Sequence, residues 1–373
     1  MTDVFDCLAN HIEGLVAPCG PFLNAGLILE REGETLAQAA AGRLRPDGPA
    51  PYLLESPLRF ASVSKVVTAR AVVALALAGK VNLDRPLADD LATPLPASVT
   101  PRSLLCHTSG LSDAAGYLID APETLSGFIS RTLPRAYGAN RRFQYSNLGF
   151  ILLGALIEKA ARQRFDLALQ ALVFDPLGIA GRFSWHGMSR AARALAGPIV
   201  RQEGASFSLQ IDGAVPAEGL QDRHGNLIDL STYVLCEHTG LFAPHAGLRM
   251  SLRDGARLAA SFGDDDPLTT AQNAPLWQYD PDTNNGDAVD GLFTSYGAGV
   301  QLHPPSDWYS YPLVGHFGNA YGAACGVWAD RERRASFTFM LNGMPHRRDT
   351  GEREAPYSQK ERDLFKMIDR ALA

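Results

Sequence analysis

Long apolar runs and basic charge are both scarce in this 373-residue chain, and each absence excludes a class of protein. The longest apolar run, residues 71–78, is far shorter than the roughly 20 residues that a membrane-spanning helix needs. The formal net charge is −6, and no basic stretch offers a footprint for nucleic acid or for an anionic membrane. We therefore expect neither a membrane nor a nucleic acid as a partner.

Cysteine is also sparse, and its spacing suggests no structural role. The five cysteines are an odd number without paired spacing: Cys7, Cys19, Cys106, Cys236 and Cys325. Nothing resembles a disulfide framework or a zinc motif, so we expect no metal and no organic cofactor. Residues 1–16 read as an amphipathic surface helix and lack the basic start and apolar run of a secretory signal. The expected location is cytoplasmic.

The overall composition is that of an ordinary globular protein, with 46% hydrophobic and 20% charged residues. Alternating patterns near both ends predict strands at 23–30, 35–44, 296–302, 321–329 and 335–341. Helical patterns lie between them, most clearly at 147–162, and a last helix is predicted at 359–372. These patterns predict an α+β fold. Its antiparallel sheet is built from N- and C-terminal segments flanked by helices, with a mostly helical region inserted.

This organisation suggests two packed regions. We predict an α/β sheet domain made of residues 1–80 and 196–373, and an inserted, mostly helical domain at 81–195. The active site would lie at their interface.

Lysine is scarce too, and one of the few lysines has an informative neighbour. The chain has only Lys65, Lys80, Lys159, Lys360 and Lys366. Ser62 precedes Lys65 by three residues at the start of an apolar helix, and residues so spaced are neighbours on a helix surface. A serine hydroxyl becomes a good nucleophile when an adjacent base takes its proton, and a lysine of lowered pKa can be that base. The alternative is that Ser62 caps the helix and Lys65 is solvated.

Two further segments carry candidate catalytic or binding groups. Tyr145 and Asn147 lie at the start of the 147–162 helix, where Tyr145 could be a buried aromatic and Asn147 an N-cap. His316 and Gly318 form a His-x-Gly sequence followed by Asn319. In this order Ser-x-x-Lys, Tyr-x-Asn and His-x-Gly resemble the serine β-lactamase and class C penicillin-binding-protein family, which includes D-aminopeptidases, D-amino acid amidases and esterases.

The resemblance implies a role for each of these residues. Ser62 would be the nucleophile, Lys65 and Tyr145 the proton-transfer groups, and the backbone N–H groups of Ser62 and Asn319 the oxyanion hole. The other predicted substrate-binding groups are Asn147, His316, Gly318 and Asn319. The residues leave open whether Lys65 or Tyr145 is the base. His107 is a second candidate base, although its segment resembles a structural loop of the family.

The His-x-Gly sequence helps to distinguish among the activities found in this family. Many β-lactamases of this family carry Lys-Thr-Gly, whereas here a histidine that can be neutral at pH 7 precedes Phe317. We therefore expect a serine hydrolase acting through an acyl-enzyme on a small amide or ester, with D-amino acid amides, D-peptides or carboxylic esters favoured. β-Lactamase or DD-carboxypeptidase activity is one alternative, and a non-catalytic binding module is another. The exact acyl and leaving groups and the oligomeric state stay open.

Overall fold

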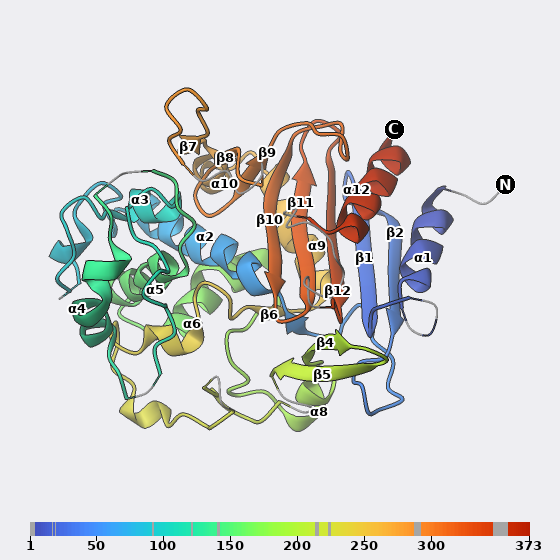
Figure 1. The fold of residues 1–373 in the computed structure, drawn as a ribbon, viewed down its shortest axis with the longest axis horizontal. Helices are drawn as coiled ribbons and strands as arrows, with labels where there is room; N and C mark the ends of the chain where they lie inside the picture. Colours follow the sequence, from blue (N-terminus) through green and yellow to red (C-terminus); the bar gives the residue numbers. More distant parts are fainter. Residues whose placement is uncertain are drawn as a thin grey trace.

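The computed structural model describes residues 4–16, 18, 20–91, 93–120, 122–139, 142–212, 216–222, 225–286, 292–345 and 357–373. Cys19 lies outside this set, and the described cysteines are free thiols. The described part is organised around an eight-stranded antiparallel sheet of order β2-β1-β12-β11-β10-β9-β8-β7 (Figure 1). Since β1 pairs with both β2 and β12, the N-terminal hairpin joins the C-terminal strands in one sheet. The predicted fold class is confirmed.

The sheet strands and two small accessory ladders have the following bounds. The sheet comprises β1 (Asn24–Arg31), β2 (Glu34–Gly42), β7 (Trp277–Gln278), β8 (Ser295–Tyr296), β9 (Gln301–His303), β10 (Leu313–Ala320), β11 (Ala323–Asp330) and β12 (Ala335–Asn342). The ladders pair β3 (Leu58–Arg59) with β6 (Arg249–Met250), and β4 (Ile199–Glu203) with β5 (Ser206–Ile211).

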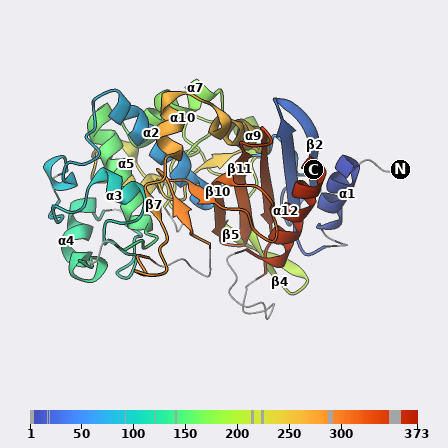
Figure 2. The same ribbon diagram turned by 90° about the horizontal axis from the view of Figure 1, so that it is seen from above.

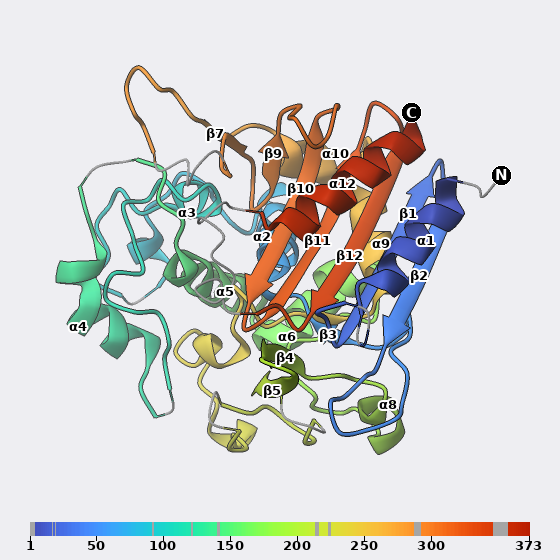
Figure 3. The same cartoon turned by 45° about the vertical axis from the view of Figure 1, so that its right-hand side comes forward.

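Both faces of the sheet are covered, as the alternation of side chains along its strands requires. On β1, Leu27 and Leu29 belong to the hydrophobic cluster that contains α1 (Val4–Gly14) and α12 (Gln359–Leu372). Ile28 points to the other cluster, which includes residues of α9 (Leu252–Ala260). Figures 2 and 3 show α1 and α12 on one face of the sheet and α9 on the other.

The helical part lies beside the β7–β10 end of the sheet. Its helices are α2 (Ser64–Leu77), α3 (Pro101–Leu105), α4 (Leu125–Ala136), α5 (Asn147–Ala161), α6 (Phe165–Leu169), α7 (Asp175–Leu177) and α10 (Pro267–Asn273). The short helix α8 (Arg190–Ala194) lies apart from them, below the β4–β5 hairpin (Figure 1). α2 and α5 pack against each other and are apolar on nearly all sides, as buried helices are. The division into domains at 80/81 and 195/196 stays a prediction.

None of the helices in the described part of the chain has both the length and the apolar character that crossing a bilayer requires.

Two features of the C-terminal strands differ from the sequence prediction. The strand expected over 296–302 is broken into β8 and β9 by a turn at residues 297–300. Gly299 has φ +68°, and a Cβ there would lie 2.4 Å from the Ala69 Cβ and 2.8 Å from the Lys65 carbonyl oxygen. The second difference is β10, which was not predicted as a strand, because its glycines and polar residues obscure the alternation. This strand carries the His-x-Gly sequence.

The contact between Gly299 and α2 gives a first testable prediction. Gly299→Ala forces a side chain into left-handed backbone and against α2, so we expect the free energy of unfolding to fall by about 2–4 kcal/mol. Urea denaturation measures this change. Gly263→Ala is the control, because a Cβ at Gly263 meets no atom within 4 Å. Equal stabilities of the two variants would contradict the close approach.

Candidate active site

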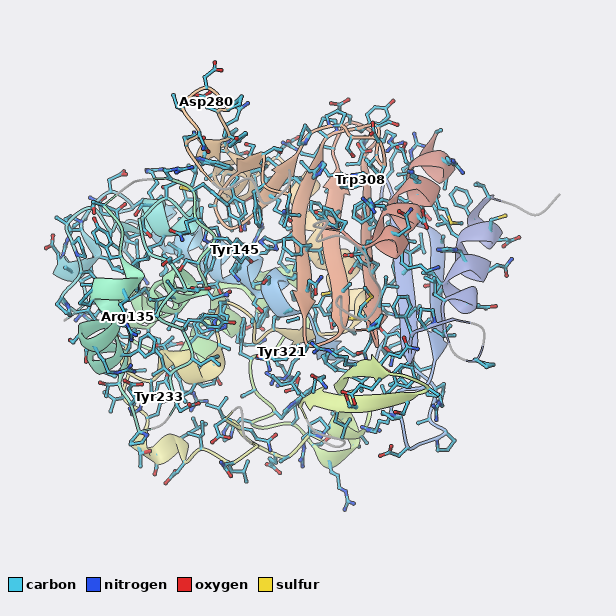
Figure 4. The ribbon with its side chains drawn as sticks, in the orientation of Figure 1. Arg135, Tyr145, Tyr233, Asp280, Trp308 and Tyr321 are labelled. Carbon is cyan, nitrogen blue, oxygen red and sulfur yellow. The ribbon has the colours of Figure 1, made fainter. Side chains whose placement is uncertain are left out.

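The residues singled out in the sequence meet where the helical part adjoins the sheet. Ser62, Asn147, His245 and Asn319 line a cavity of about 640 Å³. Figure 4 labels Tyr145 at this junction and Tyr321, another lining residue, at the lower end of β10. The lining side chains come from segments far apart in the sequence, so the cavity exists only in the folded chain.

Ser62 lies in a tight turn that leads into α2. The turn is the 3-10 helix η1 (Ala61–Val63), and Ala61 has φ +43°, an unfavourable value for a residue with a Cβ. The Ser64 hydroxyl donates to the Ala61 carbonyl at 2.6 Å and accepts from the Leu248 N–H at 2.8 Å. The segment before β6 therefore holds this strained turn in place, a pattern common at functional sites.

Lys65 is fully buried, and its ammonium group has three acceptors. Its Nζ donates to the Ser62 Oγ at 3.2 Å, the Asn147 Oδ1 at 2.8 Å and the His245 carbonyl at 3.0 Å. Burial lowers the pKa of Lys65 to about 7, although the Asp113 carboxylate acts in the opposite direction. A lysine in these surroundings exists partly as a neutral amine near neutral pH, which is the form that can accept a proton.

Asp113 fixes the position of Asn147, and the sequence analysis did not identify it. Its carboxylate accepts from the backbone N–H groups of Asn147 and Leu148 and, at 2.8 Å, from the Asn147 Nδ2. The Asn147 amide is thus oriented with its oxygen toward Lys65. The N-cap of α5 is Ser146, whose hydroxyl accepts from Gly149, so Asn147 does not have the capping role considered from the sequence. The available signal was an acidic residue six positions after His107, next to the loop segment that the family resemblance marked as structural.

Tyr145 lies between two aromatic rings beside Lys65. Its ring is tilted against His107, with centroids 4.4 Å apart, and stacks on Phe293 at 5.1 Å. Burial raises the pKa of Tyr145, and the nearby Ser62 hydroxyl only partly offsets this effect. Among the described residues its hydroxyl has no hydrogen bond of normal length and angle. The Lys65 Nζ lies over the ring, 4.7 Å from its centroid, and makes no hydrogen bond to the phenol oxygen.

His316 and His107 are joined by the buried hydroxyl of Tyr296. The Ser146 N–H donates to the His107 Nδ1 at 3.1 Å, which leaves the His107 Nε2 as the donor to the Tyr296 oxygen at 3.3 Å. Tyr296 then donates to the His316 Nε2 at 2.8 Å, and the His316 Nδ1 donates to the Phe317 carbonyl at 2.5 Å.

This chain of hydrogen bonds requires both imidazoles to be neutral. Burial lowers the pKa of His316 to about 3, and it also lowers the pKa of His107 well below its usual value. The His316 side chain is fully buried, so its surroundings favour a positioning role over the substrate contact expected from the sequence. The geometry of His107 likewise supports a structural role.

β10 presents an open edge to the Ser62 turn. The Phe317 N–H donates to the Gln301 side chain, away from β11, and the Asn319 N–H points the same way because alternate residues of a strand share an edge. A Cβ at Gly318 would lie 2.4 Å from the Phe60 carbonyl oxygen. Gly318 therefore admits the backbone before Ser62, whereas the sequence analysis had expected it to admit substrate.

An ion-pair cluster, which no sequence motif indicates, anchors the β3 segment that leads to Ser62. Arg59 and Arg249 lie directly opposite each other in the β3–β6 ladder, a destabilising arrangement for like charges. The buried Asp212 carboxylate bonds with Arg249 and lies 3.7 Å from Arg59. Burial alone would raise the pKa of Asp212, yet the two arginines hold it below its usual value. Asp212 thus links the β4–β5 hairpin to the ladder.

Comparison with known proteins agrees with this geometry. A family model described as Beta-lactamase matches residues 11–357, so the chain belongs to the Beta-lactamase family. Esterase EstB of Burkholderia gladioli is 32% identical over 183 residues, which are 42% of this chain and 46% of that protein. The aligned region thus spans less than half of that curated relative.

Solved structures share the fold across nearly the whole chain. D-amino acid amidase from Ochrobactrum anthropi SV3, complexed with L-phenylalanine amide, has a TM-score of 0.73 at 19% identity, covering 99% of this chain and 98% of that one. Beta-lactamase/D-alanine carboxypeptidase from Yersinia pestis, complexed with citrate, has a TM-score of 0.72 at 16% identity, covering 98% and 97%. At these identities the likeness establishes the fold alone.

The Tyr296 hydroxyl gives a second testable prediction. Tyr296→Phe leaves one nitrogen of each imidazole buried without its partner, so we expect a loss of about 1–3 kcal/mol in the free energy of unfolding. Tyr52→Phe is the matched control, because the buried Tyr52 hydroxyl has no hydrogen-bond partner among the described residues. Denaturant titration of both variants checks the difference. A Tyr296→Phe variant with the stability of wild type would disprove the hydrogen-bond chain from His107 to His316.

Proposed function

We propose that the protein is a serine hydrolase that forms an acyl-enzyme on Ser62 with a small ester or amide. The observation that carries this proposal is the buried Lys65 amine, which lies 3.2 Å from the Ser62 Oγ and has a pKa of about 7. A base needs to be in hydrogen-bond reach of the proton that it takes and to be unprotonated at the working pH, and Lys65 meets both conditions.

In the proposed reaction the Ser62 oxygen attacks the substrate carbonyl carbon while its proton passes to the Lys65 amine. The negative charge on the carbonyl oxygen is stabilised by the N–H groups of Ser62 and Asn319. As the carbon–leaving group bond breaks, the Tyr145 hydroxyl gives its proton to the leaving group and is reprotonated by the Lys65 ammonium. Water then attacks the acyl-enzyme carbonyl while its proton passes to the Lys65 amine. That proton returns to the Ser62 oxygen as the carbon–Ser62 bond breaks, and the carboxylic acid is released.

The geometry favours Lys65 over Tyr145 as the base in acylation. A tyrosinate needs a positive charge at its oxygen, but the Lys65 Nζ lies over the ring of Tyr145. Burial also raises the pKa of Tyr145 while it lowers that of Lys65. Both effects leave Tyr145 protonated, which suits a group that passes a proton to the leaving group.

The surroundings of His316 guide the choice of substrate. A neutral, buried imidazole supplies no positive charge to the cavity at the position where many β-lactamases carry lysine. This difference favours carboxylic esters and D-amino acid amides, the kinds of substrate named for EstB and for the amidase, over β-lactams. A binding protein that kept the fold is the competing proposal, and it does not require a lysine with a pKa near 7.

A labelling experiment tests the proposal. Wild type exposed to p-nitrophenyl acetate, D-alanine p-nitroanilide or a fluorophosphonate probe is expected to gain the mass of one acyl or phosphonyl group, with turnover of a preferred substrate. Ser62→Ala should lose both while its circular dichroism and melting temperature stay near those of wild type. Intact-protein mass spectrometry measures the adduct. Turnover by Ser62→Ala at the wild-type rate would sink the assignment.

The pH dependence tests the role of Lys65. Because the neutral amine is the active form, kcat/KM for an uncharged ester should rise with pH through about 7 and then level off. Asp113 raises the pKa of Lys65, so Asp113→Asn should shift this rise to lower pH.

Stopped-flow or plate assays from pH 5 to 9 measure the profile. Asp265→Asn serves as the control, since Asp265 is almost fully exposed and pairs with Arg331. A shift to higher pH in Asp113→Asn, or an unchanged profile, would rule out Lys65 as the titrating base.

A further inference from the structure

Arg201 lies in the wall of the cavity that contains Ser62, and its positive charge has no counter-charge among the described residues. It lies on β4, its Nε is buried, and none of the described residues accepts a hydrogen bond from that atom or forms an ion pair with its guanidinium. A buried donor without an acceptor costs free energy, and more so when it is charged. Arg201 is half-buried, and the fold thus leaves its Nε donor unsatisfied at a cost to stability.

The other charges of the cavity have partners of their own. Arg59 and Arg249 share the Asp212 carboxylate. Asp222 accepts from the backbone and the side chain of Asn226, and Asp120 is likewise not without a partner. Within the part of the chain that the structure describes, Arg201 therefore differs from the other charged lining residues in having no counter-charge.

The backbone places Arg201 beside the end of β10. A Cβ at Gly322, in the turn between β10 and β11, would lie 3.0 Å from the Arg201 Cα. That turn directly continues the β10 edge that carries Asn319, and its Tyr321 also lines the cavity. In Figure 4 Tyr321 lies at the lower end of β10, above β5. A substrate that reaches along this edge from Ser62 comes to the β4–β5 hairpin.

We propose that Arg201 binds a carboxylate on the part of the substrate remote from the scissile bond, so that the preferred substrates are anionic esters or amides. This inference rests on the proposed function, because it concerns the substrate of the same cavity. A guanidinium matches a carboxylate through two parallel N–H···O bonds, which lysine cannot make. The β4–β5 hairpin thereby supplies the positive charge that His316 does not.

Matched ester pairs test the proposal. One pair carries the charge on the acyl group (mono-p-nitrophenyl adipate against p-nitrophenyl hexanoate), and the other carries it on the leaving group (4-acetoxybenzoate against its methyl ester). For at least one pair, the anionic-to-neutral ratio of kcat/KM should fall about 10-fold or more in Arg201→Gln. Arg201→Lys should recover part of the ratio, because it keeps the charge and loses the paired bonds.

Arg190→Gln is the matched control, since it removes the same charge from exposed α8 outside the cavity. It should leave both ratios at the wild-type value. Ratios that stay at the wild-type value in Arg201→Gln for both pairs would overturn the proposal, even with efficient, Ser62-dependent hydrolysis of the neutral esters.

A binding measurement separates this inference from the proposed function. By calorimetry, Ser62→Ala should bind adipamate at least about 10-fold more tightly than hexanamide, and adding Arg201→Gln should abolish the difference. This result would support the anion site even if wild type hydrolysed no ester. Equal affinities for adipamate and hexanamide would overturn the anion site and leave the acyl-enzyme proposal standing.

Discussion

The site depends on keeping the ammonium group of Lys65 out of water. An amine at the start of an exposed helix would be charged at neutral pH and of no use as a base. Here α2 and α5 surround it with apolar side chains, and three oxygen acceptors fix its position without supplying a full negative charge. The nearest carboxylate, Asp113, acts across the Asn147 amide, which lets it orient the site while limiting how far it raises the pKa of Lys65.

The two buried histidines near Lys65 are held uncharged. A protonated His107 or His316 would repel the Lys65 ammonium, and charge–charge interactions are strong in a poorly solvated interior. The hydrogen-bond chain through Tyr296 holds each imidazole as a neutral tautomer, with a backbone group at each end. The hydrogen-bond pattern therefore keeps both imidazoles uncharged beside Lys65, whose pKa burial lowers to about 7.

The sequence predicted those helices and site residues that depend on neighbouring residues or on short motifs. The predicted helix at 359–372 matches the bounds of α12, and the Ser62, Lys65 and Asn147 side chains are brought together as the motif order indicated. β10 was not predicted because its role follows from packing on the Phe60 carbonyl, which no periodicity records. Asp113 and Tyr296 were missed because their hydrogen-bond partners Asn147 and His107 lie 34 and 189 positions away in the sequence. The Arg59–Asp212–Arg249 cluster likewise exists only once β3, β6 and the β4–β5 hairpin meet.

The contact between Gly318 and the Phe60 carbonyl has a consequence for how this enzyme family can diversify. Backbone touches backbone there, so the spacing between the β10 edge and Ser62, the proposed nucleophile, is set without any side chain that could be exchanged. The loops and the hairpin that form the cavity can then accept substitutions and insertions while the reacting groups keep their relative positions. Selection for a new substrate, in nature or in the laboratory, can therefore act on the cavity wall independently of the chemistry at Ser62.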